Sequence, residues 1–110
     1  MIEIYKRNSH TMEATYLEED GTTIDLSGFT VKFIIKREND KAENDSFALT
    51  NRSFVIGDEG ANGSFVLTLT SEDTNIPPAR YNFEVQLSNQ DELITLYQDK
   101  ILIKESFINE

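Results

Sequence analysis

The sequence predicts an all-β fold, an antiparallel sandwich of Greek-key type with about seven to nine short strands. Three observations carry this prediction. Apolar residues recur at every second position through most of the chain, which is the period of a strand with one buried face. Turn-forming residues interrupt this pattern roughly every 8 to 12 residues, and helical periodicity is almost absent. A small barrel is the competing architecture.

The predicted strands rest on alternation and on composition. Residues 29–37, 65–69 and 81–87 have β-branched and aromatic residues on one face and turn residues at both ends. Among the remaining strands, residues 10–17 alternate in the same way, whereas residues 22–26, 46–50 and 53–56 are placed by the turns and breaks beside them. In chain order the predicted strands span residues 2–5, 10–17, 22–26, 29–37, 46–50, 53–56, 65–69, 81–87 and 93–107.

Turn chemistry separates these strands. The charged turn at 18–21 ends in Asp-Gly, a pair that tolerates positive φ. Residues 38–45 are almost wholly polar and predict a solvated loop. Residues 51–52 predict a tight turn, and the glycine-rich residues 57–63 predict a flexible one. Residues 70–73 match a capping box, and the two prolines that follow limit it to about one helical turn.

The last predicted strand, residues 93–107, is too long for one regular strand, and its apolar residues change side along the way. Leu96 and Ile101 lie on opposite parities, so we expect a bulge at residues 98–100 that keeps both buried.

Phe107 and Ile108 follow the last charged residues of this strand. They either close the core at its end or form an apolar patch that needs a partner. They are therefore the candidate interface residues.

Tyr81 stands at the start of a strong strand, directly after a proline-bearing corner. In immunoglobulin-like domains such a tyrosine turns its hydroxyl back onto the upstream backbone and fastens the corner. The alternative is a core aromatic whose hydroxyl reaches water. The first interpretation favours an immunoglobulin-like β-sandwich.

The chain has 110 residues and a mass of 12.6 kDa, so we expect one domain over residues 1–110. Its formal net charge of -10 repels phosphate backbones and anionic lipids, and we expect neither nucleic acid nor membrane as a partner. It has no cysteine, no basic-then-apolar leader after Met1 and no apolar run of about 18 residues. We therefore expect no disulfide, no secretion and no membrane span.

The residues predict a protein that is not an enzyme and that holds no cofactor or metal. His10 is the only histidine, so the usual zinc ligand sets and Cys-His catalysis cannot form within one chain. Neither a Gly-x-Ser-x-Gly elbow nor a phosphate-binding glycine motif occurs, and His10 is expected to be an exposed residue at a strand start. Acidic turns at 18–20, 58–59 and 91–92 would suit calcium, but charged turns are most often solvated ends that keep strand edges from aggregating, and this interpretation is favoured.

Five segments carry a family resemblance: Ile-Glu-Ile-Tyr-Lys at 2–6, residues 11–16, Asp-Gly-Thr-Thr-Ile-Asp-Leu-Ser-Gly-Phe-Thr-Val-Lys-Phe at 20–33, Gly-Ser-Phe-Val-Leu-Thr-Leu at 63–69 and Arg-Tyr-Asn-Phe-Glu-Val-Gln-Leu at 80–87. In this order they resemble the immunoglobulin-like domain of tailed-phage structural proteins, in particular the N-terminal domain of baseplate upper proteins. The resemblance implies a phage or prophage virion component, assembled in the bacterial host cytoplasm. It would be a structural adaptor in tail, baseplate or fibre, with other tail proteins and further copies of itself as partners.

A carbohydrate-binding β-sandwich is the alternative function. In that case Tyr5, Tyr16 or Tyr97 would provide stacking platforms for a bacterial surface glycan.

Overall fold

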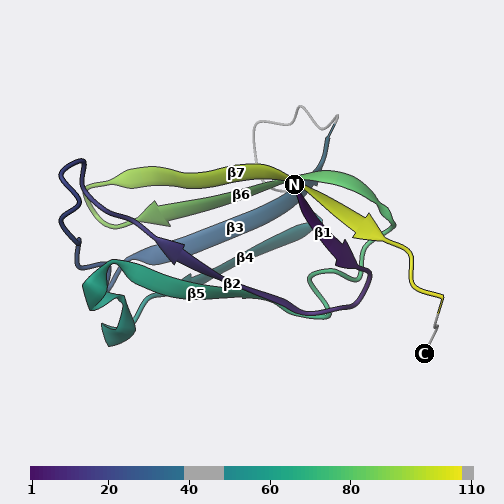
Figure 1. The fold of residues 1–110 in the computed structure, drawn as a ribbon, viewed down its shortest axis with the longest axis horizontal. Helices are drawn as coiled ribbons and strands as arrows, with labels where there is room; N and C mark the ends of the chain where they lie inside the picture. The colour runs from purple at the N-terminus through teal and green to yellow at the C-terminus, as the bar shows by residue number, and fades with distance from the viewer. Residues whose placement is uncertain (39–48, 108–110) are drawn as a thin grey trace.

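The computed structural model describes residues 1–38 and 49–107, and in these residues the fold is all-β, as predicted. Two sheets face each other across a shared core, an arrangement compatible with a β-sandwich (Figure 1). One sheet has five strands in the order β1-β7-β6-β3-β4, and the other pairs β2 with β5. The strands are β1 (Ile2–Tyr5), β2 (His10–Thr15), β3 (Thr30–Arg37), β4 (Thr50–Val55), β5 (Ser64–Leu69), β6 (Ala79–Ser88) and β7 (Leu93–Lys104).

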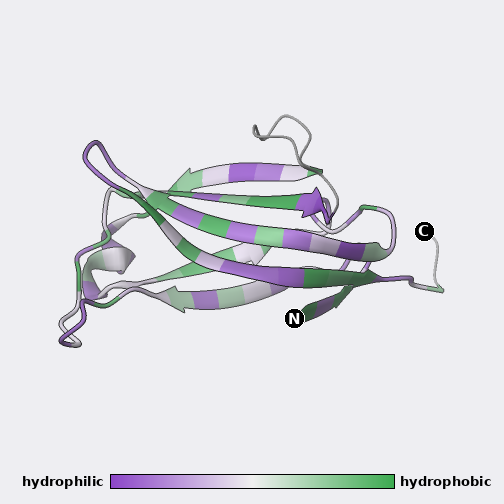
Figure 2. Ribbon diagram, turned by 90° about the horizontal axis from the view of Figure 1, so that it is seen from above, coloured by the Kyte–Doolittle hydropathy of each residue, from purple (hydrophilic) through white to green (hydrophobic). Residues whose placement is uncertain are grey.

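Alternation of buried and solvent-facing residues builds the core, and it is clearest in β3, β5 and β6. Figure 2 shows hydrophobic and hydrophilic residues following one another along the long strands. Each fully buried Val, Leu, Ile or Phe side chain contributes about 1.5–3 kcal/mol relative to an exposed one. The buried apolar residues are Ile4, Leu26, Val31, Phe33, Ile35, Ile56, Phe65, Leu67, Leu69, Ile76, Tyr81, Phe83, Val85, Leu87, Ile101 and Ile103.

The larger sheet is mixed, which corrects the prediction of antiparallel pairing throughout. β1 runs parallel to β7, with Ile2 opposite Ile101 and Ile4 opposite Ile103. The chain leaves β1 for the smaller sheet, where β2 pairs with β5 alone among the described strands. This parallel pairing places Ile4 beside Ile103, and both side chains are buried.

β4 is one continuous strand through the position where a tight turn was predicted. Residues 51–52 lie inside it, and Arg52 is paired with Phe33 on the inner face. The prediction of a turn at 51–52 was wrong because both residues pair with β3, and the Arg52 side chain forms an ion pair with Asp73 in the turn that follows β5. Most of the loop predicted at 38–45, and residues 46–48, lie outside the described residues.

β7 contains the predicted bulge at a different place. Val85 and Gln86 of β6 pair with Tyr97 and Thr95, so Leu96 is the extra residue. The bulge therefore precedes the predicted position at 98–100, and it turns both Leu96 and Tyr97 toward the smaller sheet. β7 ends at Lys104.

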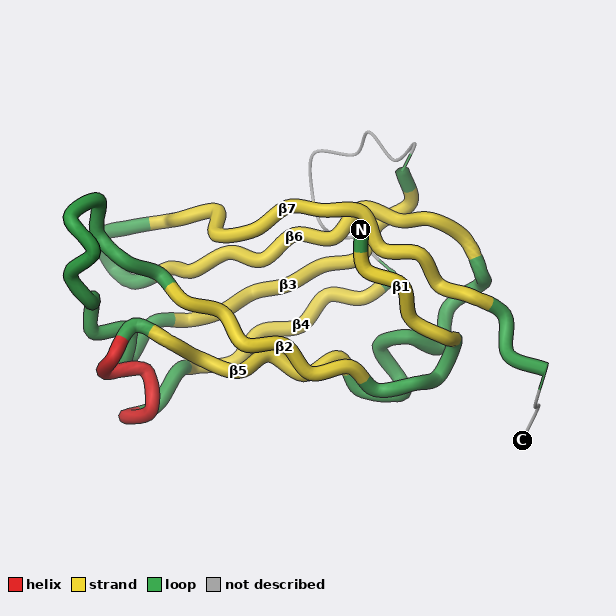
Figure 3. The backbone as a smooth tube through the Cα atoms, in the orientation of Figure 1, coloured by secondary structure: helices red, strands yellow, loops and turns green. Residues whose placement is uncertain are grey.

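The glycine-rich segment between β4 and β5 is a short 3-10 helix, η2 (Asp58–Asn62), not a flexible turn. It lies at the end of the molecule opposite β1 (Figure 3). Gly60 is buried there, and its carbonyl accepts the N–H of Leu26 at 2.9 Å. No strand forms at residues 22–26, where one was predicted. Leu26 bonds to Gly60 instead, and Thr23 forms only an isolated bridge with Leu17.

The turn after β5 follows its prediction. The Asp73 carboxylate accepts the Thr70 N–H at 2.7 Å, and the Asp73 N–H points back to the Thr70 hydroxyl at 3.3 Å. This reciprocal cap closes a single turn before the prolines, as the capping-box pattern indicated.

Replacement of Gly60 tests the close packing of η2. A Cβ at this position would lie 2.3 Å from Cγ2 of Ile56, so we expect Gly60→Ala to lower the free energy of unfolding by about 1–3 kcal/mol. Gly57→Ala is the matched control, because its Cβ would meet only the movable Glu59 carboxylate, and it should cost under about 0.5 kcal/mol. Urea denaturation measures both, and equal costs would contradict this packing.

Candidate functional site

One long side of the molecule is closed by contacts between β4 and the smaller sheet. The rings of Phe54 and Phe65 meet edge to face with centroids 6.4 Å apart. Arg52 places Nη1 2.8 Å from Oδ2 of the buried Asp73, and its guanidinium lies 5.7 Å from the Phe33 ring centroid. Aromatic packing and a partly buried ion pair therefore seal this side.

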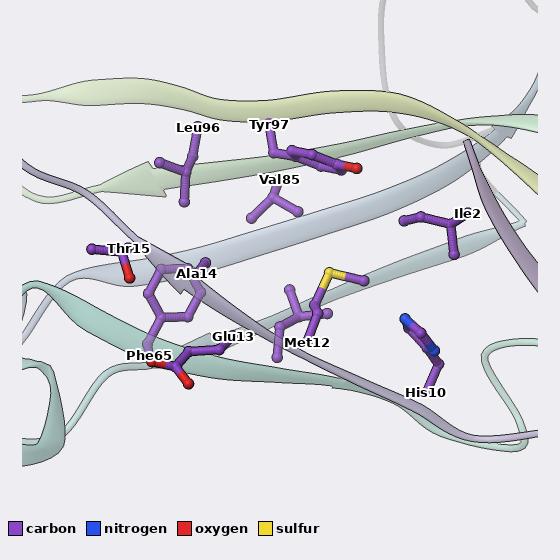
Figure 4. Close-up of a pocket in the computed structure, with 11 residues that line it drawn as sticks. Ile2, His10, Met12, Glu13, Ala14, Thr15, Phe65, Val85, Leu96 and Tyr97 are labelled. Atoms are coloured by element: carbon purple, nitrogen blue, oxygen red, sulfur yellow. The ribbon is translucent and has the colours of Figure 1, made fainter.

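The opposite side is open. Between β2 and β7 lies a cleft of about 340 Å³. This volume is near the lower end of the range for small-molecule binding sites. Figure 4 shows the lining side chains, which come from β2, β5, β6 and β7, with Ile2 of β1 at one end. The residues that line it are Ile2, His10, Met12, Glu13, Ala14, Thr15, Phe65, Leu67, Val85, Leu96 and Tyr97. Most of these side chains are apolar, so the cleft favours apolar groups.

The backbone of β2 beside this cleft is paired on one side only, among the strands that the structure describes. Tyr16 N–H donates to Gly63 O at 2.8 Å in continuation of the β2–β5 register. Hydrogen-bonded pairs recur at every second residue of an antiparallel ladder, so the even-numbered residues of β2 bond to β5. Thr11, Glu13 and Thr15 therefore direct their N–H and C=O groups to the open edge.

Side-chain contacts agree with this assignment of hydrogen-bonded and non-hydrogen-bonded pairs. Thr11 and Thr68 hydroxyls lie 3.2 Å apart, and Thr15 and Ser64 hydroxyls 3.0 Å apart. Such close side-chain contacts are typical of the non-hydrogen-bonded pairs of an antiparallel ladder.

The polar groups near Tyr97 are already bonded to one another. The Tyr97 hydroxyl donates to Asp99 at 2.8 Å, and the N-terminal ammonium of Met1 lies 3.4 Å from the same carboxylate. Burial, followed by the bond to Asp99, raises the pKa of Tyr97. The Lys100 N–H, followed by the Tyr97 hydroxyl, lowers the pKa of Asp99. Asp99 is thus an anion at neutral pH and is not a proton donor.

Tyr81 occupies the corner that its sequence position suggested. Its side chain is 1% exposed, and its hydroxyl donates to the carbonyl of Pro77, four residues upstream. Burial raises the pKa of this phenol above the usual 10.0. The bond ties the start of β6 to the segment before it.

Phe107 lies beyond the end of β7, and its side chain is 98% exposed. It does not close the core, so that alternative is wrong. Ile108 lies outside the described residues.

The structure places the histidine and the acidic turns considered in the sequence at separate positions. His10 begins β2 but is half-buried at the cleft, which corrects the expectation of an exposed histidine. The acidic turn at 18–20 lies with Glu92 around one surface hollow. Neither there nor elsewhere in residues 1–38 and 49–107 do three or more His, Cys, Asp or Glu gather in a metal-binding group.

The three tyrosines considered for glycan stacking are not brought together. Tyr97 lines the cleft, whereas Tyr16 lines the acidic hollow beside the 18–20 turn. Tyr5 lies on β1, with the Lys104 ammonium 4.4 Å from its ring centroid. They therefore form no common platform.

No family model matches the chain, and no curated protein shows significant sequence similarity to it. Within the described residues no helix has the length and hydropathy needed to cross a membrane.

The open edge and the cleft were not predicted from the sequence. A two-residue period shows which side chains share a face, but it does not show whether a neighbouring strand covers an edge. Glu13, a charge in the middle of a short strand, was the one available signal, because edge strands often carry charges.

The Tyr81 corner predicts a change of stability at high pH. Burial favours the protonated phenol, so the stability linked to its raised pKa is complete below pH 10.0 and is lost as pH rises through the folded-state value. Tyr81→Phe should cost about 0.5–1.5 kcal/mol at pH 7 and should lose less further stability than the wild type above pH 10.

Urea denaturation at several pH values measures this effect. Tyr5→Phe, which removes a hydroxyl from a half-exposed ring, is the control and should follow the wild-type profile. Parallel high-pH profiles for Tyr81→Phe and the wild type would contradict a buried Tyr81 phenol.

Proposed function

We propose that this protein is a non-enzymatic virion component of a phage or prophage, an adaptor in tail, baseplate or fibre assembly, built on an immunoglobulin-like domain. The proposal starts from the resemblance of five sequence segments to tailed-phage structural domains. It predicts assembly in the bacterial cytoplasm and contacts with other tail proteins.

The strand order is the observation that carries the immunoglobulin-like assignment. In such domains strands G, F, C and C′ are neighbours in one sheet, while B and E belong to the other. The series β7-β6-β3-β4 and the pair β2-β5 correspond to this arrangement. The bond from Tyr81 to the Pro77 carbonyl matches the tyrosine corner at the start of strand F.

The surface of the domain suits an adaptor. Strands β1, β4, β2 and β5 each form an outer edge of a described sheet, and edges can pair with strands of neighbouring proteins. Phe107 adds a fully exposed aromatic side chain just after β7. Aromatic residues that are buried on association are frequent anchors of interfaces.

The proposal predicts that the protein is present in purified particles. Mass spectrometry of virions, with light-scattering measurement of the mass of the isolated protein, should find it in the particle and associated with itself or with a tail protein. Phe107→Ser, which alters an exposed side chain and should preserve the melting temperature, is expected to reduce incorporation. A strictly monomeric protein that is missing from particles would contradict the proposed role.

A further inference from the structure

We propose that the open edge of β2 and the adjoining cleft bind an extended segment of a partner protein as an added β-strand. The segment would alternate apolar residues with polar ones and would carry a Lys or Arg near Glu13. This inference rests on the proposed adaptor function, because it assigns the surface that such an adaptor would use for one of its contacts.

The backbone of β2 supplies the first requirement of strand addition. Thr11, Glu13 and Thr15 present N–H and C=O groups on the side away from β5. An incoming strand would bond to these groups and would convert the two-stranded sheet into a three-stranded one. Three strands with an apolar face are the smallest sheet expected to be stable by itself, whereas a two-stranded one is marginal.

The cleft supplies the second requirement. A neighbouring strand lies about 4.8 Å from β2 in the direction of the unpaired groups, which is the direction of β7. Every second side chain of that strand points into the space between the sheets. There it would meet Met12, Ala14 and Leu96, so apolar residues fit at alternate positions.

The negative charge of Glu13 and of the whole chain distinguishes between two possible occupants of the edge, a second copy of this chain and a segment of another protein. Glu13 is exposed at the middle of the edge, and it forms no ion pair within the parts of the chain that the structure describes. Two β2 strands paired about a two-fold axis at Glu13 would place these carboxylates opposite each other, which is destabilising. Each copy also carries a net charge of -10. A second copy is therefore disfavoured, and a basic segment of another protein is favoured.

The probe is a synthetic peptide with blocked ends and the sequence KTVKLKVTK, in which Val, Leu and Val share one face. We expect it to bind the full chain with a Kd of about 10–100 µM, measured by calorimetry. In a backbone NMR titration the shifted amides should be those of β2 and of the cleft. The control peptide KTKVLVKTK has the same composition and charge but no alternation, and it should bind at least about tenfold more weakly.

A pair of proline variants tests the edge. Glu13→Pro removes an N–H that points to the open side and that β5 does not use, so the strand can tolerate it. Val66→Pro is the matched control, because Val66 is the cross-strand partner of Glu13 and its N–H points to the opposite edge of the sheet. Glu13→Pro should weaken binding at least about tenfold, and Val66→Pro should leave it unchanged.

Two further variants keep the test independent of the prolines. Ala14→Phe fills the cleft without changing the backbone and should also weaken binding of KTVKLKVTK. Glu13→Lys should lower the affinity for this peptide about fivefold and raise the affinity for ETVELEVTE by a similar factor. A native-like NMR spectrum of each variant establishes that it is folded.

Three outcomes would overturn the inference. In the first, KTVKLKVTK fails to bind at millimolar concentration. In the second, it binds Ala14→Phe and Glu13→Lys as tightly as it binds the wild type. In the third, the free protein dimerises through β2 and Glu13→Pro abolishes the dimer. The adaptor role is judged separately by the presence of the protein in particles. A protein that is found in virions and ignores the peptide refutes strand addition alone.

Discussion

A sheet of five strands buries its inner face against a sheet of two. This difference in width determines which parts of the larger sheet are covered and which are left open. The central strands β3 and β6 are covered, as the complete burial of Phe33 and Phe83 indicates. On the β4 side, Phe54 and the Arg52–Asp73 ion pair extend across the margin and close it. On the β7 side nothing equivalent is found in the described residues, and the uncovered apolar surface forms the cleft.

The course of the first two strands produces the open edge. β1 pairs with β7 in the larger sheet, whereas β2 continues the chain in the smaller one. Consecutive strands are usually neighbours in space, and here the change of sheet leaves β2 without its sequence neighbour. The bulge at Leu96 then turns β7 residues toward the gap that results. Edge and cleft therefore share one topological cause.

Local patterns in the sequence determine which residues face the core, and these parts of the fold could be predicted. The alternation in residues 29–37 and 81–87 places Val31, Phe33 and Val85 correctly. The Thr70–Asp73 cap was predictable for the same reason, since its partners lie three residues apart. Each of these features depends on near neighbours along the chain.

Features set by distant partners were predicted wrongly or not at all. Residues 51–52 have the composition of a turn, but they pair with β3, and Arg52 forms an ion pair with Asp73, which lies far from it in the sequence. The parallel pairing of β1 depends on where β7 lies, and no period in residues 2–5 encodes it. The cleft is likewise a property of the space between two sheets. The binding of an added strand that we propose for it rests on that geometry and not on a sequence motif.

Residue-resolved amide hydrogen exchange of the free protein tests most directly whether β2 is open on one side. The account predicts alternation along the strand, with slow exchange for Met12 and Ala14, whose N–H groups bond to β5, and fast exchange for Thr11, Glu13 and Thr15. Uniformly slow exchange along β2 would mean that this edge is already covered, and it would contradict the account.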